Sequence, residues 1–109
     1  MDEVIFKIAP HALWREAEAR GTFTGAPVDV RDGYIHFSTA TQLEETARRH
    51  FAGQRALVLV EVDATVLGPA LRWEPSRGGA LFPHLYGPLP LTAVRSVVPY
   101  VVPADVASP

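Results

Sequence analysis

The uneven distribution of proline is the feature of this sequence that most restricts its fold. The chain contains ten prolines in 109 residues, and most of them follow Gly68. Proline fixes φ and has no backbone N–H, so it breaks helices and interrupts the inner strands of a sheet. We therefore expect helices only in the first half, and short strands joined by fixed turns in the second half.

Two helices are predicted in the first half, each of them after a strand. The mostly apolar residues 4–9 predict a first strand, and residues 11–20 predict a helix that ends at Gly21. A second strand over residues 34–38 leads into a second helix over about residues 41–52. The order strand, helix, strand, helix is therefore expected before the proline-rich half.

The sequence also predicts how the second helix begins and what connects the first helix to the second strand. Thr39 with Gln42, or alternatively Thr41 with Glu44, fits a capping box at the start of the second helix. Residues 22–31 have neither helical nor strand periodicity, so we expect a loop that lies over the candidate site.

The second half predicts several strands. Residues 56–62 form a nearly continuous apolar run, which is typical of a central strand covered on both faces. Residues 71–74 predict a short strand, and residues 94–102 predict a last strand that Pro99 confines to an edge or a bulge. Early helices and late strands predict an α+β domain with a small, mostly antiparallel or mixed sheet. We expect one globular domain over residues 1–103 and a flexible tail over residues 104–109.

Composition excludes several classes of function. The formal net charge is −2, so no basic field indicates nucleic-acid or membrane binding. The absence of cysteine excludes disulfides, thiolate catalysis and cysteine-based zinc sites. No apolar run approaches the roughly 20 residues that span a bilayer. The N-terminus begins with acidic residues and not with a secretory signal, so we expect a cytoplasmic protein.

Two stretches concentrate the residues that are capable of chemistry. In Asp32-Gly33-Tyr34-Ile35-His36-Phe37-Ser38, strand alternation places Tyr34, His36 and Ser38 on one face, close to a helix N-terminus that favours anions. In Phe82-Pro83-His84-Leu85-Tyr86-Gly87, the same alternation places His84 and Tyr86 on one face.

Glu74 and Arg77 complete this polar set, for which we weigh two interpretations. The set forms a binding site, or else His36 is a buried histidine with a satisfied partner and His84 and Tyr86 cap the core. Arg77-Gly78-Gly79 is either a clamp for phosphate or carboxylate or a glycine turn beside a solvated arginine. Glu61 is either a solvated strand end or a carboxylate aimed into the cleft.

Common catalytic motifs are missing from the sequence. It contains no G-x-S-x-G elbow, P-loop, H-E-x-x-H or G-x-G-x-x-G. A serine hydrolase built on Ser38 lacks a placed acid and an oxyanion hole. His36 and His84 with a carboxylate could meet at a metal, but no ligand spacing supports such a site, and we predict none.

The same stretches resemble the small bacterial proteins grouped as domain-of-unknown-function family 952. The resemblance extends over nearly the whole chain and rests on residues 32–40 with Gln42, Thr46, Ala47 and Phe51, on Leu71-Arg72-Trp73-Glu74, and on Arg77-Gly78-Gly79 with residues 82–87. More distantly, that family is similar to the ADP-ribosyltransferase fold, which binds NAD in a cleft between two small sheets.

The distant resemblance implies a role for each candidate residue. It implies a split sheet, NAD as candidate substrate without a metal, and His36, Glu74 and His84 as catalytic residues. His36 and Glu74 would hold the ribose next to nicotinamide. Ser38 would hold the strand or the carboxamide, and Tyr86, or else Tyr34, would stack on nicotinamide.

The resemblance implies that Arg77 or His84 binds the pyrophosphate of NAD. No Glu follows Glu74 in the chain, whereas the last motif of that fold is a Glu on a late strand. This departure motivates three alternatives: a chemistry like that of the RNA phosphotransferases of the same fold, a non-catalytic module that binds a nucleotide or small anion, and a purely structural cluster.

Overall fold

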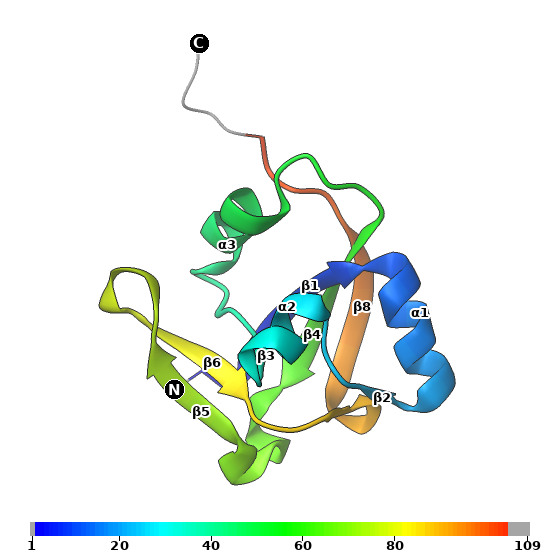
Figure 1. Cartoon of the computed structure of the whole chain (residues 1–109), viewed down its shortest axis with the longest axis vertical. Coiled ribbons are helices and arrows are strands. Elements are labelled where there is room, and N and C mark those ends of the chain that lie inside the picture. The colour runs from blue at the N-terminus through cyan, green and yellow to red at the C-terminus, as the bar shows by residue number, and fades with distance from the viewer. Residues whose placement is uncertain (1, 105–109) are drawn as a thin grey trace.

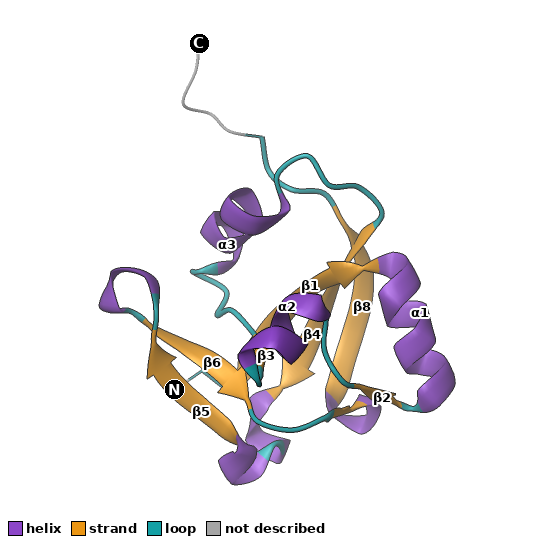
Figure 2. Ribbon diagram, viewed as in Figure 1, coloured by secondary structure: helices purple, strands orange, loops and turns teal. Residues whose placement is uncertain are grey.

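The computed structural model of the chain describes residues 2–104, apart from the side chain of Arg77. Its strands are β1 (Val4–Pro10), β2 (Thr22–Phe23), β3 (Ile35–His36), β4 (Leu57–Asp63), β5 (Leu71–Pro75), β6 (Leu81–Leu85), β7 (Leu89–Pro90) and β8 (Val94–Tyr100) (Figure 1). Its α-helices are α1 (His11–Arg20), α2 (Pro27–Asp32) and α3 (Leu43–Phe51) (Figure 2). Short 3-10 helices cover Ala64–Val66, Gly68–Ala70, Arg77–Gly79 and Leu91–Ala93.

The strands form three small antiparallel sheets. Two of them have three strands, in the orders β1-β4-β8 and β3-β6-β5, and the third pairs β2 with β7. A single bridge between Phe6 of β1 and Ser38 connects the two larger sheets. The predicted mixture of helices with small antiparallel sheets is confirmed, and the strands dominate the second half as the prolines require.

The strand β4 lies at the centre of its sheet and is covered on both faces. Val58, Val60 and Val62 join the main core, whereas Leu57 and Leu59 pack with a second cluster beside α3. This confirms the prediction from the continuous apolar run. The strand β8 is the edge that carries Pro99, also as predicted.

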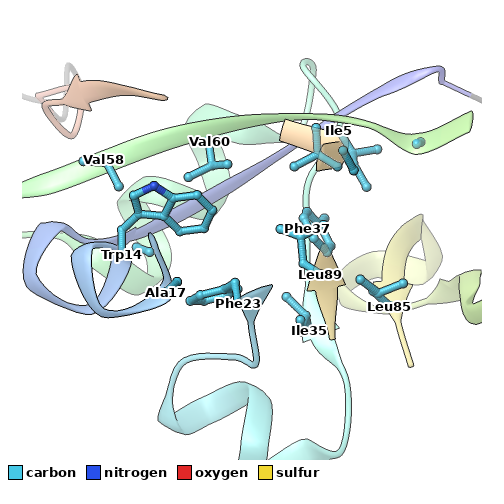
Figure 3. Packing of buried hydrophobic residues seen from close by; sticks show 14 residues of the cluster. Ile5, Trp14, Ala17, Phe23, Ile35, Phe37, Val58, Val60, Leu85 and Leu89 are labelled. Atoms are coloured by element: carbon cyan, nitrogen blue, oxygen red, sulfur yellow. The ribbon is translucent and has the colours of Figure 1, made fainter. Parts of the chain in front are cut away.

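The main core lies between the β1-β4-β8 sheet, α1 and β2. Figure 3 shows Trp14 of α1 and Phe23 of β2 packed below Val58 and Val60, with their ring centroids 5.4 Å apart. Ile5 and Ala9 of β1 face this core, whereas Ile8 faces the second cluster with Ala47 of α3. The helices α1 and α3 therefore cover opposite faces of β1.

The predicted loop over residues 22–31 is wrong. The segment contains strand β2 and most of helix α2, so residues 2–104 contain three α-helices and not two. Pro27 occupies the first turn of α2, where its missing N–H has no intrahelical partner in any case. Gly33 ends α2 at φ 90°, which is a conformation that glycine adopts without steric cost. A helix of six residues is too short to show periodicity in the sequence.

Other predicted boundaries are refined. The strand expected over residues 34–38 is reduced to Ile35–His36, with Ser38 in the isolated bridge to Phe6. Thr39 and Gln42 exchange the two expected hydrogen bonds, from the Thr39 N–H to Gln42 Oε1 at 3.0 Å and from the Gln42 N–H to Thr39 Oγ1 at 3.3 Å. They close the turn before α3 and do not cap it, because the N-cap of α3 is Gln42 and has no side-chain cap hydrogen bond. Residues 105–109 of the expected tail lie outside the described residues.

None of the helices within residues 2–104 combines the length and apolar character that crossing a bilayer requires.

The contact between Trp14 and Phe23 leads to a test of the core. Phe23 is fully buried, so Phe23→Ala should lower the free energy of unfolding by about 3 to 5 kcal/mol. Urea denaturation measures the change, and Val101→Ala is the control because Val101 is 85% exposed. An effect of Phe23→Ala as small as that of the control would contradict this core.

Candidate functional site

Four rings from two neighbouring strands and their flanking residues form one group, which we call the ring cluster (Tyr34, His36, His84 and Tyr86). The register of β3 against β6 places His36 directly opposite His84. Tyr34 stacks on His84 with centroids 4.2 Å apart, and lies 4.6 Å from His36 and 5.1 Å from Tyr86. The structure therefore brings together four residues that the sequence predicted from two separate stretches.

Glu74 joins the ring cluster from the third strand of the same sheet. Its Oε1 atom accepts the Tyr86 hydroxyl at 2.7 Å and lies 2.8 Å from His84 Nδ1. The hydrogen bonds from His84 and Tyr86 lower the pKa of Glu74, so this carboxyl is ionised at neutral pH. Because an ionised carboxylate only accepts hydrogen bonds, Nδ1 of His84 carries the proton. The Nε2 atom of a neutral His84 is then a proton acceptor.

A positive charge also contacts the ring of Tyr86. The guanidinium carbon of Arg72 lies 4.8 Å from the centroid of the Tyr86 ring, which is within the range of a cation–π contact. Tyr86 therefore contacts a cation with its ring and the Glu74 carboxylate with its hydroxyl. Its hydrogen bond to Glu74, together with burial, raises the pKa of the Tyr86 phenol, which stays protonated.

The residue that holds His36 is Asp29 of α2, and the sequence analysis did not identify it. The side chain of Asp29 is only 1% exposed, and its Oδ1 atom lies 2.6 Å from His36 Nδ1 and accepts the His36 N–H at 3.1 Å. Oδ2 accepts the Ala26 N–H at 2.7 Å. Lys7 Nζ lies 2.9 Å from Oδ2 and 3.0 Å from Oδ1. One carboxylate thus connects β1, α2 and β3.

The charge state of Asp29 follows from these contacts. Burial alone would raise the pKa of the Asp29 carboxyl, but the hydrogen bond from His36 and the charge of Lys7 outweigh it and lower the pKa to about 2. Burial also lowers the pKa of Lys7, although Asp29 opposes that shift. Asp29 is therefore a permanent anion that accepts from His36.

Asp32 contacts the other nitrogen of His36. The distance from His36 Nε2 to Asp32 Oδ2 is 3.0 Å, and Arg31 Nε donates to Asp32 Oδ1 at 3.0 Å. The hydrogen bond from Arg31 lowers the pKa of Asp32. Both ring nitrogens of His36 therefore face carboxylates, and the 32% exposed side chain remains open to a ligand.

Three other residues that were considered for the site do not contact the ring cluster, or have a side chain outside the described part of the structure. Ser38 is buried and donates from Oγ to Thr46 Oγ1 at 3.0 Å, so its hydroxyl connects to α3 and not to the ring cluster. Glu61 faces Arg95 of β8, with 3.6 Å between Oε2 and Nε, and is not part of the cluster. Arg77-Gly78-Gly79 forms the turn between β5 and β6, but the side chain of Arg77 lies outside the described part of the structure.

A pocket of about 690 Å³ adjoins the ring cluster, and we call it the main pocket. Tyr34, His36 and His84 line it together with residues of β1, α2 and α3. Its lining is Phe6, Lys7, Ile8, Pro10, Ala26, Pro27, Val28, Arg31, Asp32, Tyr34, His36, Phe37, Ser38, Thr46, His50, Phe51, Gln54, Ser76, Phe82 and His84. Aromatic faces, the imidazoles of His36, His50 and His84, and the Asp32 carboxylate at one pocket suit a planar ligand and proton transfer.

The residues that the sequence analysis missed carried weak signals. Lys7 is a charged residue within an apolar strand, and such a residue is rarely buried without a partner. Pro27 followed two residues later by Asp29 is compatible with the first turn of a helix. Only the fold shows that these two residues meet.

The buried ion pair gives a stability prediction with a defined sign. The pKa of Asp29 is lower in the folded state than its ordinary value, so its contribution is complete above about pH 4 and is lost as pH falls toward 2. Asp29→Asn should therefore lower the free energy of unfolding by about 2 to 3 kcal/mol at pH 7, and less at pH 3.

Urea denaturation at several pH values measures this dependence. The double variant Lys7→Met with Asp29→Asn is the control, because it removes the unpaired buried charge and should regain part of the lost stability. Equal losses at pH 7 and pH 3 would show that the carboxylate charge is not what stabilises the site.

Comparisons with known proteins agree with this fold. The X-ray structure of protein CC0527 from Caulobacter crescentus is 48% identical in sequence, covers 94% of this chain and 90% of that chain, and superimposes with a TM-score of 0.90. The solution NMR structure of CC0527 is also 48% identical, covers 90% of this chain and 84% of that chain, and has a TM-score of 0.80. No curated protein matches the chain.

The family described as "Protein of unknown function (DUF952)" matches residues 8–97. These residues include the ring cluster, Asp29 and Glu74. The chain therefore belongs to the DUF952 family.

Proposed function

We propose that the main pocket binds NAD or a related ADP-ribosyl nucleotide, and that the ring cluster with Glu74 cleaves the bond between nicotinamide and ribose. The observation that carries the proposal is the meeting of two histidines, two tyrosines and a glutamate beside a pocket of about 690 Å³. The distant resemblance to the ADP-ribosyltransferase fold, in which a strand His, an aromatic residue and a Glu serve NAD, adds support.

The position of Glu74 supports this proposal despite its early place in the sequence. Glu74 precedes Tyr86 by twelve residues, yet β5 pairs with β6 and Glu74 Oε1 accepts the Tyr86 hydroxyl. A late Glu is therefore not needed to bring a carboxylate to the cluster.

The rings and carboxylates of the cluster suit the nicotinamide end of NAD. Nicotinamide in NAD is a planar pyridinium cation, and aromatic faces attract such cations. Tyr86 and Tyr34 are the residues to stack on it, and His36, held by Asp29 and Asp32, would contact the adjacent ribose.

The reaction needs no oxidant or reductant. The bond between the ribose C1′ carbon and the pyridinium nitrogen breaks, and its electron pair leaves with nicotinamide, which becomes neutral. The positive charge passes to the ribose as an oxocarbenium ion, and the Glu74 carboxylate stabilises that charge. Water then forms a bond to C1′ and gives its proton to His84 Nε2. The products are nicotinamide, ADP-ribose and one proton.

Nicotinamide release tests the proposal. Wild-type protein incubated with NAD should release nicotinamide, measured by chromatography, and His36→Ala should release it at least about 100-fold more slowly. His11→Ala is the matched control, because His11 is exposed at the start of α1 and does not line the main pocket.

Two other results would have different meanings. Equal release by wild type and His36→Ala would remove His36 from the mechanism. Saturable binding of NAD without any release, seen as a thermal shift of the wild type, would identify a non-catalytic nucleotide-binding module.

The Glu74→Gln variant separates the effect of the negative charge of Glu74 from the effect of its size and shape. Gln keeps an oxygen that accepts from Tyr86 but removes the negative charge, so nicotinamide release at saturating NAD should fall about 100-fold or more while KM changes little. Because the pKa of Glu74 is lowered, its carboxylate stays ionised at mildly acidic pH, so protonation of Glu74 should reduce wild-type release only under more acidic conditions. A Glu74→Gln variant with wild-type turnover would contradict the electrostatic role.

A further inference from the structure

The edge of β1 is open where it borders the main pocket. β1 pairs with β4 on one side only, and its other side faces Ser38 and the pocket. Phe6 donates its N–H to the Ser38 carbonyl at 2.8 Å and accepts from the Ser38 N–H at 2.9 Å. The backbone groups of Phe6 therefore point away from β4.

The backbone N–H and C=O of Ile8 point in the same direction as those of Phe6. In an antiparallel pair, residues alternate between those that exchange hydrogen bonds with the partner strand and those whose N–H and C=O point outward. Phe6 and Ile8 are two residues apart in the continuous register that pairs them with Glu61 and Leu59. The N–H and C=O of Ile8 thus also point away from β4. No backbone hydrogen bond across this edge engages them within residues 2–104.

The open edge is one residue long. Toward the N-terminus of β1, Ser38 already bonds to the N–H and C=O of Phe6. Toward its C-terminus, Pro10 has no backbone N–H. A polypeptide strand needs a row of donors and acceptors to add to a sheet, whereas one adjacent donor and acceptor match one small planar group. This edge therefore suits a small molecule and not a peptide strand.

Apolar and polar side chains surround the open edge. Ile8 packs in the second cluster with Phe51 of α3, and the pocket beside it is also lined by His50 and Gln54. Ile8 lies about 7 Å along β1 from Phe6, the residue bonded to Ser38. Ile8 and three rings of the ring cluster, Tyr34, His36 and His84, thus line the same pocket.

We propose that the backbone N–H and C=O of Ile8 bind the edge of a purine, the adenine of the ligand whose nicotinamide lies at the ring cluster. Adenine carries a ring-nitrogen acceptor next to the N6 amino donor, which complements the N–H and C=O of a single residue. This base site rests on the proposed function for its place in the whole ligand, but adenine recognition itself does not require catalysis.

Proline substitution removes the proposed donor and also shortens the buried Ile8 side chain. Proline is tolerated on an edge strand where its nitrogen faces outward, so Ile8→Pro deletes the N–H while leaving the β1–β4 ladder intact. Ile8→Ala is the matched control. It keeps the N–H, and it removes at least as much of the buried Ile8 side chain as Ile8→Pro does. Ile8→Pro should bind ADP-ribose about fivefold to tenfold more weakly than Ile8→Ala in calorimetric titrations.

Two smaller compounds test the nicotinamide and adenine parts of the ligand separately. Nicotinamide mononucleotide lacks adenine, so its affinity should be the same in Ile8→Pro and Ile8→Ala. Adenosine lacks nicotinamide and pyrophosphate, and should bind the wild type and lose affinity in Ile8→Pro. Equal ADP-ribose affinities in the two variants, or equal weakening of nicotinamide mononucleotide, would overturn the base site.

A measurement on the wild type avoids dependence on the folding of a variant. Adenosine should shift the Ile8 amide resonance in ¹⁵N–¹H NMR spectra and slow its hydrogen exchange, whereas the Phe6 amide, already bonded to Ser38, should change less. An unmoved Ile8 amide at saturating adenosine, or no binding of any adenine compound, overturns the inference. Adenosine binding without nicotinamide release from NAD supports the base site and overturns only the proposed catalysis.

Discussion

The buried Asp29 carboxylate is the contact on which the candidate site depends. It accepts hydrogen bonds from Lys7 of β1, from the backbone at the start of α2 and from His36 of β3. A buried anion is unfavourable unless its oxygens are all satisfied, so these partners must be present together. The position of His36, the placement of α2 and the pairing of Lys7 are consequently parts of one arrangement.

A second constraint is the register of the β3-β6-β5 sheet. His36 lies opposite His84, and Arg72 lies opposite His84 on the other side, which leaves Glu74 within reach of His84 and Tyr86. A slip of one residue would turn His84 to the other face and dissolve the ring cluster. The chemistry of the site therefore depends on backbone pairing as much as on side-chain identity.

Local patterns in the sequence predicted the elements whose causes are local. The prolines of the second half, the apolar run of β4, the hydrogen bonds between Thr39 and Gln42 and the edge position of Pro99 all act within a few residues. The same reasoning failed for residues 22–31, because the six residues of α2 are too few for periodicity and because packing on β1 and β3 stabilises that helix. It also did not identify Thr46 as the hydrogen-bond partner of the Ser38 hydroxyl.

The sequence by itself determined the class of fold, the helical and strand halves, and the four rings that could do chemistry, because alternation along a strand is a local property. Only the tertiary structure decided that Asp29 and Lys7 support His36, that Glu74 reaches the ring cluster from an earlier strand, and that Ile8 leaves one donor and one acceptor open to the pocket. These facts depend on which strands are neighbours and which edges stay unpaired. Contacts between residues far apart in the chain are set by the packing of whole elements, and no short pattern encodes them.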